Sequence, residues 1–301
     1  MVLPGSASGR LVICGFGLIG GSIAAGVREA GMAGAIVGVD ADPVVLDEAR
    51  RAGLLDGAGW PADLGPDDLV LIAVPTLSVA SILEALWDAE QGLLAGGAVV
   101  SDVASVKQPV LDAARDICGG LPANFVPGHP IAGSERSGVG AARADLFRDH
   151  RVILTPVAET APAARQRVAG LWQQLGAEVV DMAVDEHDRV LAMTSHLPHL
   201  LAFALVDTLG RSPEHEAVFR FAAGGFRDFT RIASSDPVMW SDIFTANAAA
   251  VSAVLDRLDA ELAELRGLLE TGDRDGLRTI FARAKALRDA HVTGHAGGGH
   301  E

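Results

Sequence analysis

The distribution of hydrophobic and polar residues divides the chain into two parts. Up to about residue 182, short apolar runs rich in valine, isoleucine and leucine alternate with longer amphipathic stretches. Apolar runs without polar alternation are typical of parallel strands buried on both faces, and their alternation with helices is typical of an α/β domain. The apolar runs occupy 11–13, 35–39, 69–74, 98–100, 125–127, 152–154 and 178–180. We therefore predict one doubly wound parallel sheet over residues 10–182.

From residue 183 to residue 291 the pattern predicts helices only. A long apolar helix covers 184–209, and Pro198 within it predicts a kink, because proline removes one helical hydrogen bond. Further on, leucines recur with alternating spacings of three and four, as in helices that pack in pairs. These leucines are Leu255, Leu258, Leu262, Leu265 and Leu269. Two interpretations of this stripe stay open, a subunit interface and packing inside the helical domain.

The composition is that of a globular protein, with 49% hydrophobic and 21% charged residues in 301. The net charge of −15 argues against nucleic acid or an anionic membrane as a partner. Cys14 and Cys118 are far apart in the sequence, which favours a reducing, cytoplasmic compartment. The uncharged run 11–27 is too short and too rich in glycine for a membrane span. The small or polar ends, 1–9 and 292–301, are predicted to be disordered tails.

A glycine-rich segment follows the first apolar run and opens the first helix. Gly15 permits a tight turn, Gly17 lets the backbone approach a pyrophosphate, and Gly20 lets the helix pack closely on the strand. The N-terminus of the helix then faces the phosphates of a dinucleotide. The predicted cofactor-binding residues of this turn are Gly15, Phe16, Gly17, Leu18, Ile19 and Gly20. The segment predicts a Rossmann-like, dinucleotide-binding domain.

Asp40 ends the second apolar run, about 20 residues after the glycine turn. A carboxylate at this position accepts hydrogen bonds from the ribose hydroxyls of NAD and repels the 2′-phosphate of NADP. We therefore predict NAD as the cofactor, although Arg50 and Arg51 lie one helix away. The alternative is that Asp40 is only a polar residue at a strand end. Pro75 follows the third run and is predicted to lie at the same edge of the sheet.

The segment 129–138 brings a histidine, hydroxyls, a carboxylate and a guanidinium together after a short apolar run. The carboxyl ends of parallel strands meet at one edge, so His129, Ser105 and Pro75 are expected to lie near the cofactor. A histidine there can take the proton of a hydroxyl while a hydride leaves the same carbon. The alternatives are a histidine with a purely structural hydrogen bond and a plain polar surface loop.

Two histidines, His196 and His199, lie three residues apart in the long predicted helix and so share one face. No third ligand stands at a convincing spacing, so we predict no metal site and favour buried or substrate-facing roles. Arg231 has apolar neighbours in the sequence, which predicts a buried guanidinium that needs an anionic partner. Asp228 is placed to hold that guanidinium.

With these segments collected, the chain resembles the prephenate dehydrogenase family. Five motifs in the order of the family carry the resemblance across nearly the whole chain. They are GFGLIGGS at 15–22, SDVASVK at 101–107, HPIAGSERSG at 129–138, SHLPH at 195–199 and DFTRIASSDPVMW at 228–240. The resemblance implies a dinucleotide-binding domain followed by an all-α domain, 183–291, that forms a homodimer.

The resemblance also implies a reaction, the NAD-dependent oxidative decarboxylation of prephenate to 4-hydroxyphenylpyruvate in tyrosine biosynthesis. In that reaction His129 is the base, Ser105 holds the same hydroxyl, and Arg231 binds a substrate carboxylate. The further residues implied to line the substrate pocket are His199, His196, Ser134 and Trp240.

Two alternatives to this activity stay open. The motifs do not separate prephenate from arogenate, since the two substrates differ only at a keto or amino group, so an arogenate or dual-specificity cyclohexadienyl dehydrogenase is the first. The second is a non-catalytic NAD-binding sensor, against which His129, Ser105 and Arg231 argue.

Overall fold

The computed structural model of the chain describes residues 9–291, apart from 33, 88–96 and 135. It forms two compact units, Met1–Ala248 and Ala249–Glu301. Of the predicted tails, 1–8 and 292–301 lie outside the described residues, and Gly9 is buried.

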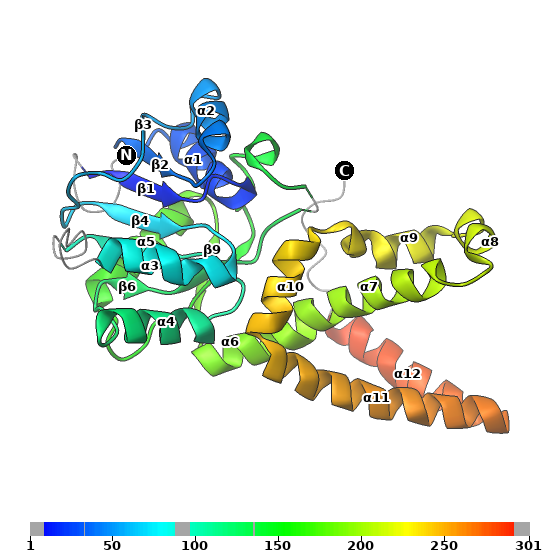
Figure 1. The fold of residues 1–301 in the computed structure, drawn as a ribbon. Coiled ribbons are helices and arrows are strands. Elements are labelled where there is room, and N and C mark those ends of the chain that lie inside the picture. Colours follow the sequence, from blue (N-terminus) through cyan, green and yellow to red (C-terminus); the bar gives the residue numbers. More distant parts are fainter. Residues whose placement is uncertain (1–8, 33, 88–96, 135, 292–301) are drawn as a thin grey trace. The chain divides into compact units, whose positions relative to one another are not determined.

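The first unit is built on a six-stranded parallel sheet with the order β3-β2-β1-β4-β5-β6 (Figure 1). The predicted doubly wound sheet is therefore confirmed. The strands are β1 (Leu11–Cys14), β2 (Ile36–Val39), β3 (Gly57–Ala58), β4 (Leu69–Ile72), β5 (Val99–Asp102) and β6 (Phe125–Val126). The sequence pattern did not predict β3, which is two residues long. The strand order reverses between β1 and β4, the position where open α/β sheets bind ligands.

Both faces of this sheet carry a core, because residues that alternate along a strand point to opposite faces. Leu11 and Ile13 belong to one apolar cluster, and Val12 and Cys14 belong to the other. The covering helices are α1 (Leu18–Glu29), α2 (Pro43–Arg51), α3 (Val79–Trp87), α4 (Gln108–Cys118) and α5 (Pro162–Gln174). The sheet is thereby buried on both sides, as its uninterrupted apolar strands require.

The last strands of the first unit form a separate sheet, so the expectation of one sheet over 10–182 is wrong in this part. β7 (Gly128–Pro130) pairs antiparallel with β8 (Arg151–Leu154), which pairs parallel with β9 (Glu178–Asp181). His129 therefore lies within a strand, opposite Ile153, and does not follow one. Pro127 has no N–H to donate to a ladder, so β6 ends before it and the chain continues into the second sheet.

Helices follow from residue 184 in the first unit. They are α6 (Val184–Leu191), a π-helical turn (Ala192–His196), α7 (Leu197–Gly210), α8 (His215–Arg220), α9 (Gly224–Thr230), a 3₁₀ turn (Arg231–Ser234) and α10 (Pro237–Ala246). The π turn ends two residues before Pro198, the proline at which the sequence predicts a kink. Such turns often occur at functional sites.

By length and hydropathy alone, the helix from Val184 to Gly210 could cross a membrane. It carries His187, Asp188 and His196, which are buried and hydrogen-bonded to other elements of the first unit. Polar groups held in this way are typical of a helix that packs into a globular unit.

The second unit contains the helices α11 (Ala248–Thr271), which begins at the last residue of the first unit, and α12 (Arg274–His291). Gly272 joins them in the left-handed conformation, at a φ of 65°. Arg283 of α12 lies 3.7 Å from Glu261 of α11. Apolar side chains stay exposed on both helices; they are Leu262, Leu269, Phe281 and Leu287.

Candidate active site

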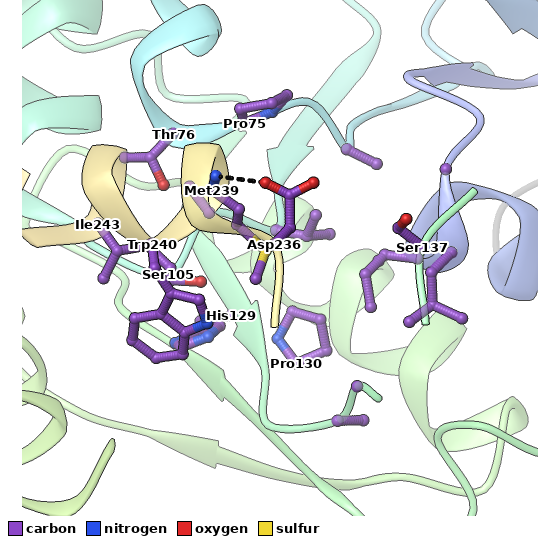
Figure 2. A pocket seen from close by; sticks show the side chains of 18 of the residues that line it. Pro75, Thr76, Ser105, His129, Pro130, Ser137, Asp236, Met239, Trp240 and Ile243 are labelled. Carbon is purple, nitrogen blue, oxygen red and sulfur yellow. Dashed lines mark hydrogen bonds between the residues drawn. The ribbon is translucent and has the colours of Figure 1, made fainter. Parts of the chain in front are cut away.

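A pocket of about 380 Å³ lies in the first unit, at the carboxyl ends of β1, β4 and β5. Its walls come from the glycine turn, from the loops after β4 and β5, from the segment 129–138, and from residues of the helical segment. Figure 2 shows Ser105 and His129 from the sheet side and Asp236 and Trp240 from the α10 side around this space. The pocket therefore brings together residues from all five motifs.

The glycine turn forms one wall of the pocket through Gly17, Leu18 and Ile19. Gly17 has open space where a side chain would point, and no side chain caps the N-terminus of α1 within the described residues. Its first N–H groups are thus available to an anion, which is what the phosphates of a dinucleotide require. The turn therefore fits the predicted cofactor.

The other residues of the turn act from behind the pocket. Gly15 has a φ of 93°, and a Cβ on Gly20 would collide with the carbonyl oxygen of Gly15. The side chain of Phe16 is fully buried in the core, while its backbone N–H donates to Asp40 Oδ2 at 2.8 Å. Gly15, Phe16 and Gly20 thus shape the turn without lining the pocket.

Asp40 is half-buried beside the turn, where its two oxygens accept from the N–H groups of Phe16 and Asp42. A carboxylate has about four acceptor positions, so two bonds leave capacity for hydroxyl donors. Pro75 and Thr76 line the pocket after β4. The expected cofactor residues thus lie at one edge of the sheet.

His129 lines the pocket and is 9% exposed, and Ser105 lines it from the loop after β5. Burial lowers the pKa of His129 well below its ordinary value, and the charges of His187, Lys107 and His196 lower it further. The imidazole is therefore neutral at physiological pH and able to accept a proton. This is the state that a general base needs.

Behind His129 lies a buried hydrogen-bonded chain that the sequence did not reveal. His129 Nδ1 is 2.9 Å from His187 Nε2, and His187 Nδ1 is 2.7 Å from Asp188 Oδ1. His187 is fully buried and Asp188 nearly so. In the sequence, the acidic stretch at 185–188 looks like the solvated first turn of a helix, so no local pattern singled these residues out.

Lys107 is a second buried polar residue that sequence reasoning missed. Its ammonium group donates to the carboxylate of Asp102 and, at 2.6 Å, to the carbonyl oxygen of Gly128. Both side chains of this ion pair are fully buried. The pair therefore joins the end of β5 to β7, the strand that carries His129.

On the helical side, His196 lines the pocket and is 1% exposed. Burial lowers its pKa to about 4, and its Nδ1 lies 3.1 Å from Asn247 Nδ2. His199 does not line the pocket but stacks on Trp240, with ring centroids 3.7 Å apart. Trp240 does line it. Of the two histidines, His196 therefore lines the pocket directly, and His199 packs against a residue that lines it.

Arg231 is exposed in the described chain and does not line the pocket, so the expectation that it is buried is wrong. It begins a 3₁₀ turn after α9, and the helices α8 and α9 before it bury no residue. Its charge is close enough to lower the pKa of His199, after the larger effect of burial. It therefore lies near the Trp240–His199 stack.

The segment 129–138 contributes Ser134, Arg136 and Ser137 to the pocket. Ser134 Oγ accepts a hydrogen bond from the backbone N–H of Arg136 at 3.1 Å. Glu135 lies outside the described residues. Arg136, the guanidinium of this segment, lines the pocket as a cation. Among the described residues, no three histidine, cysteine or acidic side chains are grouped as metal ligands.

Comparison with known proteins gives matches along almost the whole chain. A family model described as prephenate dehydrogenase, nucleotide-binding domain, matches residues 23–181, and one described as prephenate dehydrogenase, dimerization domain, matches 183–283. A cyclohexadienyl dehydrogenase from Zymomonas mobilis is 36% identical and is aligned over 95% of this chain and 97% of the relative. A prephenate dehydrogenase from Bacillus subtilis is 38% identical over 93% of this chain and 75% of the relative.

Among solved structures, the chain is similar to prephenate dehydrogenase from Aquifex aeolicus in complex with hydroxyphenyl propionate and NAD⁺. The TM-score is 0.85 at 35% identity, and the match covers 94% of this chain and 98% of the other.

Proposed function

The chain belongs to the prephenate dehydrogenase family, and on this premise we propose that it converts prephenate and NAD⁺ to 4-hydroxyphenylpyruvate, CO₂ and NADH in tyrosine biosynthesis. The observation that carries the proposal is His129, a buried neutral imidazole in a pocket that the glycine turn also lines. A non-catalytic NAD-binding sensor has no use for a base kept neutral in this position.

His129 and Ser105 act on the ring hydroxyl of the substrate. His129 accepts the hydroxyl proton, and Ser105, on the neighbouring loop, holds the same oxygen by a hydrogen bond. NAD⁺, when bound, accepts the hydride from the carbon that carries this hydroxyl. Loss of the ring carboxylate as CO₂ is then driven by formation of the aromatic ring, and the ring oxygen takes the proton back from His129 to give the 4-hydroxyl group.

Prephenate carries two carboxylates, and the chain has a net charge of −15, so binding requires locally placed cations. Arg231 is proposed to bind one carboxylate, with His199 beside it. Arg136 lines the pocket and supplies a second cation. Ser134, His196 and Trp240 complete the proposed substrate site from both sides of the pocket.

NAD is proposed as the preferred cofactor because Asp40 keeps acceptor capacity beside the glycine turn. The turn residues Gly15, Phe16, Gly17, Leu18, Ile19 and Gly20 and the neighbouring Pro75 form the proposed cofactor site. A phosphate on the ribose would be repelled by the Asp40 carboxylate.

We propose that residues 10–182 form the cofactor domain and 183–291 a helical domain that forms a homodimer. The start of α6 at Val184 supports the boundary. Exposed apolar side chains support the dimer, among them Phe221, Phe229, Leu269 and Phe281. The free thiols of Cys14 and Cys118 favour the cytoplasm as the compartment.

A second candidate is a dual-specificity enzyme that also accepts arogenate. The relative named cyclohexadienyl dehydrogenase, which matches the chain over nearly its full length, favours it. Asp236 lines the pocket, and a carboxylate there can attract the ammonium group that distinguishes arogenate.

The test is a steady-state assay of NADH or NADPH formation with prephenate and with arogenate, each offered NAD⁺ and NADP⁺. We expect the highest kcat/KM with prephenate and NAD⁺, with 4-hydroxyphenylpyruvate as the product. Comparable values for both substrates would favour dual specificity. No turnover with any pair would overturn the proposal.

A further inference from the structure

A chain of three buried side chains runs from the pocket into the protein. His129 is followed by His187, 58 residues away in sequence, and His187 by its neighbour Asp188. Both links have the length of good hydrogen bonds, 2.9 and 2.7 Å. In the proposed reaction, only His129 has an assigned role.

The direction of the hydrogen bonds follows from Asp188. Its oxygens accept from the backbone N–H groups of Lys107 and Gln108, at 2.8 and 2.9 Å. Burial raises the pKa of this carboxyl, but the hydrogen bonds from His187, Lys107 and Gln108 outweigh burial and hold the pKa below its ordinary value. Asp188 is therefore ionised and can only accept, so His187 Nδ1 carries a proton.

His187 itself is neutral, because burial lowers its pKa more than the bond to Asp188 raises it. With its proton on Nδ1, its Nε2 has a lone pair and can only accept. His129 must then donate from Nδ1, and the free lone pair of His129 lies on Nε2. The carboxylate thus sets the tautomer of a histidine two hydrogen bonds away.

We propose that His187 and Asp188 are positioning residues that hold His129 in the tautomer with a free Nε2 in the pocket. The inference rests on the proposed function, in which His129 is the base. In the reaction, Nε2 takes the hydroxyl proton of the substrate while the proton on Nδ1 stays shared with His187. The positive charge that His129 gains is stabilised through His187 by the Asp188 carboxylate.

The other groups around the chain support this charge balance. The ammonium group of Lys107 is paired with the carboxylate of Asp102 and also interacts with that of Asp188, so two carboxylates share one cation. His196 contacts Asn247, whose amide also donates to the backbone oxygen of Asp188 at 2.9 Å. One carboxylate therefore remains unbalanced beside the histidines until His129 becomes protonated.

A purely structural role is the competing explanation, since Asp188 also binds the first N–H groups at the start of α4. The variants His187→Gln and His187→Leu distinguish a role in setting the tautomer of His129 from a purely structural role. Glutamine can place an oxygen near the position of Nε2 and accept from His129, whereas leucine fills similar space without an acceptor.

We expect His187→Leu to lower kcat by about 10²–10³, within the range known for removal of a tautomer-setting partner or a general base. The KM for NAD⁺ should change less than about twofold, and His187→Gln should keep kcat within about tenfold of the unsubstituted enzyme. A kcat for His187→Leu within about threefold of that enzyme would overturn the proposal, as would equal losses in both variants.

A second measurement needs neither a substrate nor a variant of His187. ¹⁵N-histidine labelling of the full chain reports by NMR which ring nitrogen is protonated, and the His129 signals are those lost in His129→Asn. We expect a protonated Nδ1 and a bare Nε2 in His129. A proton on Nε2 would overturn the relay and leave the proposed function, tested by turnover, in place.

Discussion

The two sides of the pocket are held in different ways. On the sheet side, His129 lies on a strand, and a buried ion pair and buried hydrogen bonds fix it from behind. On the helical side, the lining residues His196 and Trp240 are also buried, but Arg231, which lies outside the pocket, is exposed, and α8 and α9 before it bury no residue. The first unit therefore holds the proposed base in its core and leaves the proposed carboxylate-binding residue at the surface.

The sheet side is therefore the preorganised half of the proposed site. A base held by buried hydrogen bonds costs no reorganisation at the moment of reaction. Arg231 is exposed, as is its apolar neighbour Phe229, so burial does not fix the position of its guanidinium. Substitutions on the two sides should therefore affect different quantities.

The largest effect is expected on the sheet side. His129→Asn removes the base, so kcat should fall by about 10²–10⁴ while the KM values stay close to those of the unsubstituted enzyme. Steady-state assays with prephenate and NAD⁺ measure this, with the exposed His215→Asn as a control that keeps full activity. Activity of His129→Asn within tenfold of the unsubstituted enzyme would remove His129 from the mechanism.

Lys107→Met tests how strongly the sheet side is held. The substitution leaves the Asp102 carboxylate buried without its cation, which should lower the free energy of unfolding by about 3–5 kcal/mol. Urea unfolding measures the loss, and adding Asp102→Asn should recover part of it. A loss below about 1 kcal/mol would mean that the buried pair does not hold this side.

Arg231→Ala should act on binding instead. Loss of a charged hydrogen bond of about 1.5–3 kcal/mol should raise the KM for prephenate by about tenfold to a hundredfold. Stability should change by less than about 0.5 kcal/mol, because the side chain is exposed. Arg227→Ala, on the same exposed segment, is the matched control. Equal KM values in the two variants would contradict the role of Arg231.

Asp40→Ala should weaken NAD⁺ binding by about tenfold, from loss of the charged hydrogen bonds to the ribose, and should reduce the preference over NADP⁺. The ratio of kcat/KM for the two cofactors is the readout. Asp42→Asn is the control, since it can keep the N-cap bond to Val44. An unchanged ratio in Asp40→Ala would argue that Asp40 only shapes the turn.

The smallest effect is expected from pH. A histidine with the ordinary pKa of about 6.5 would lose about tenfold activity as a base at pH 5.5. Burial lowers the pKa of His129, so the neutral form persists to lower pH and kcat/KM should fall less than about twofold between pH 7 and 5.5. A tenfold fall over this interval would show that His129 is not kept neutral.

Local sequence determined most of the cofactor side. Strands of the parallel sheet, the turn at Gly15 and the position of Asp40 each follow from a pattern within a few residues, because they depend on local apolar runs and backbone freedom. Sequence also singled out His129, Ser105, Ser134 and Trp240, all of which line the pocket. It overestimated the burial of Arg231, because apolar neighbours in sequence do not establish that a core covers them.

Only the tertiary structure decided what surrounds His129. The contact of His129 with His187 joins residues 58 apart, and that of Lys107 with Asp188 joins residues 81 apart. Sequence periodicity does not reveal such pairs, because the pattern of residues 185–188 is the same whether this first turn of α6 faces water or a buried histidine. The second sheet, which places His129 on a strand, is decided in the same way. The sequence thus determined which residue is the candidate base, and the packing of distant segments decided what fixes its proton.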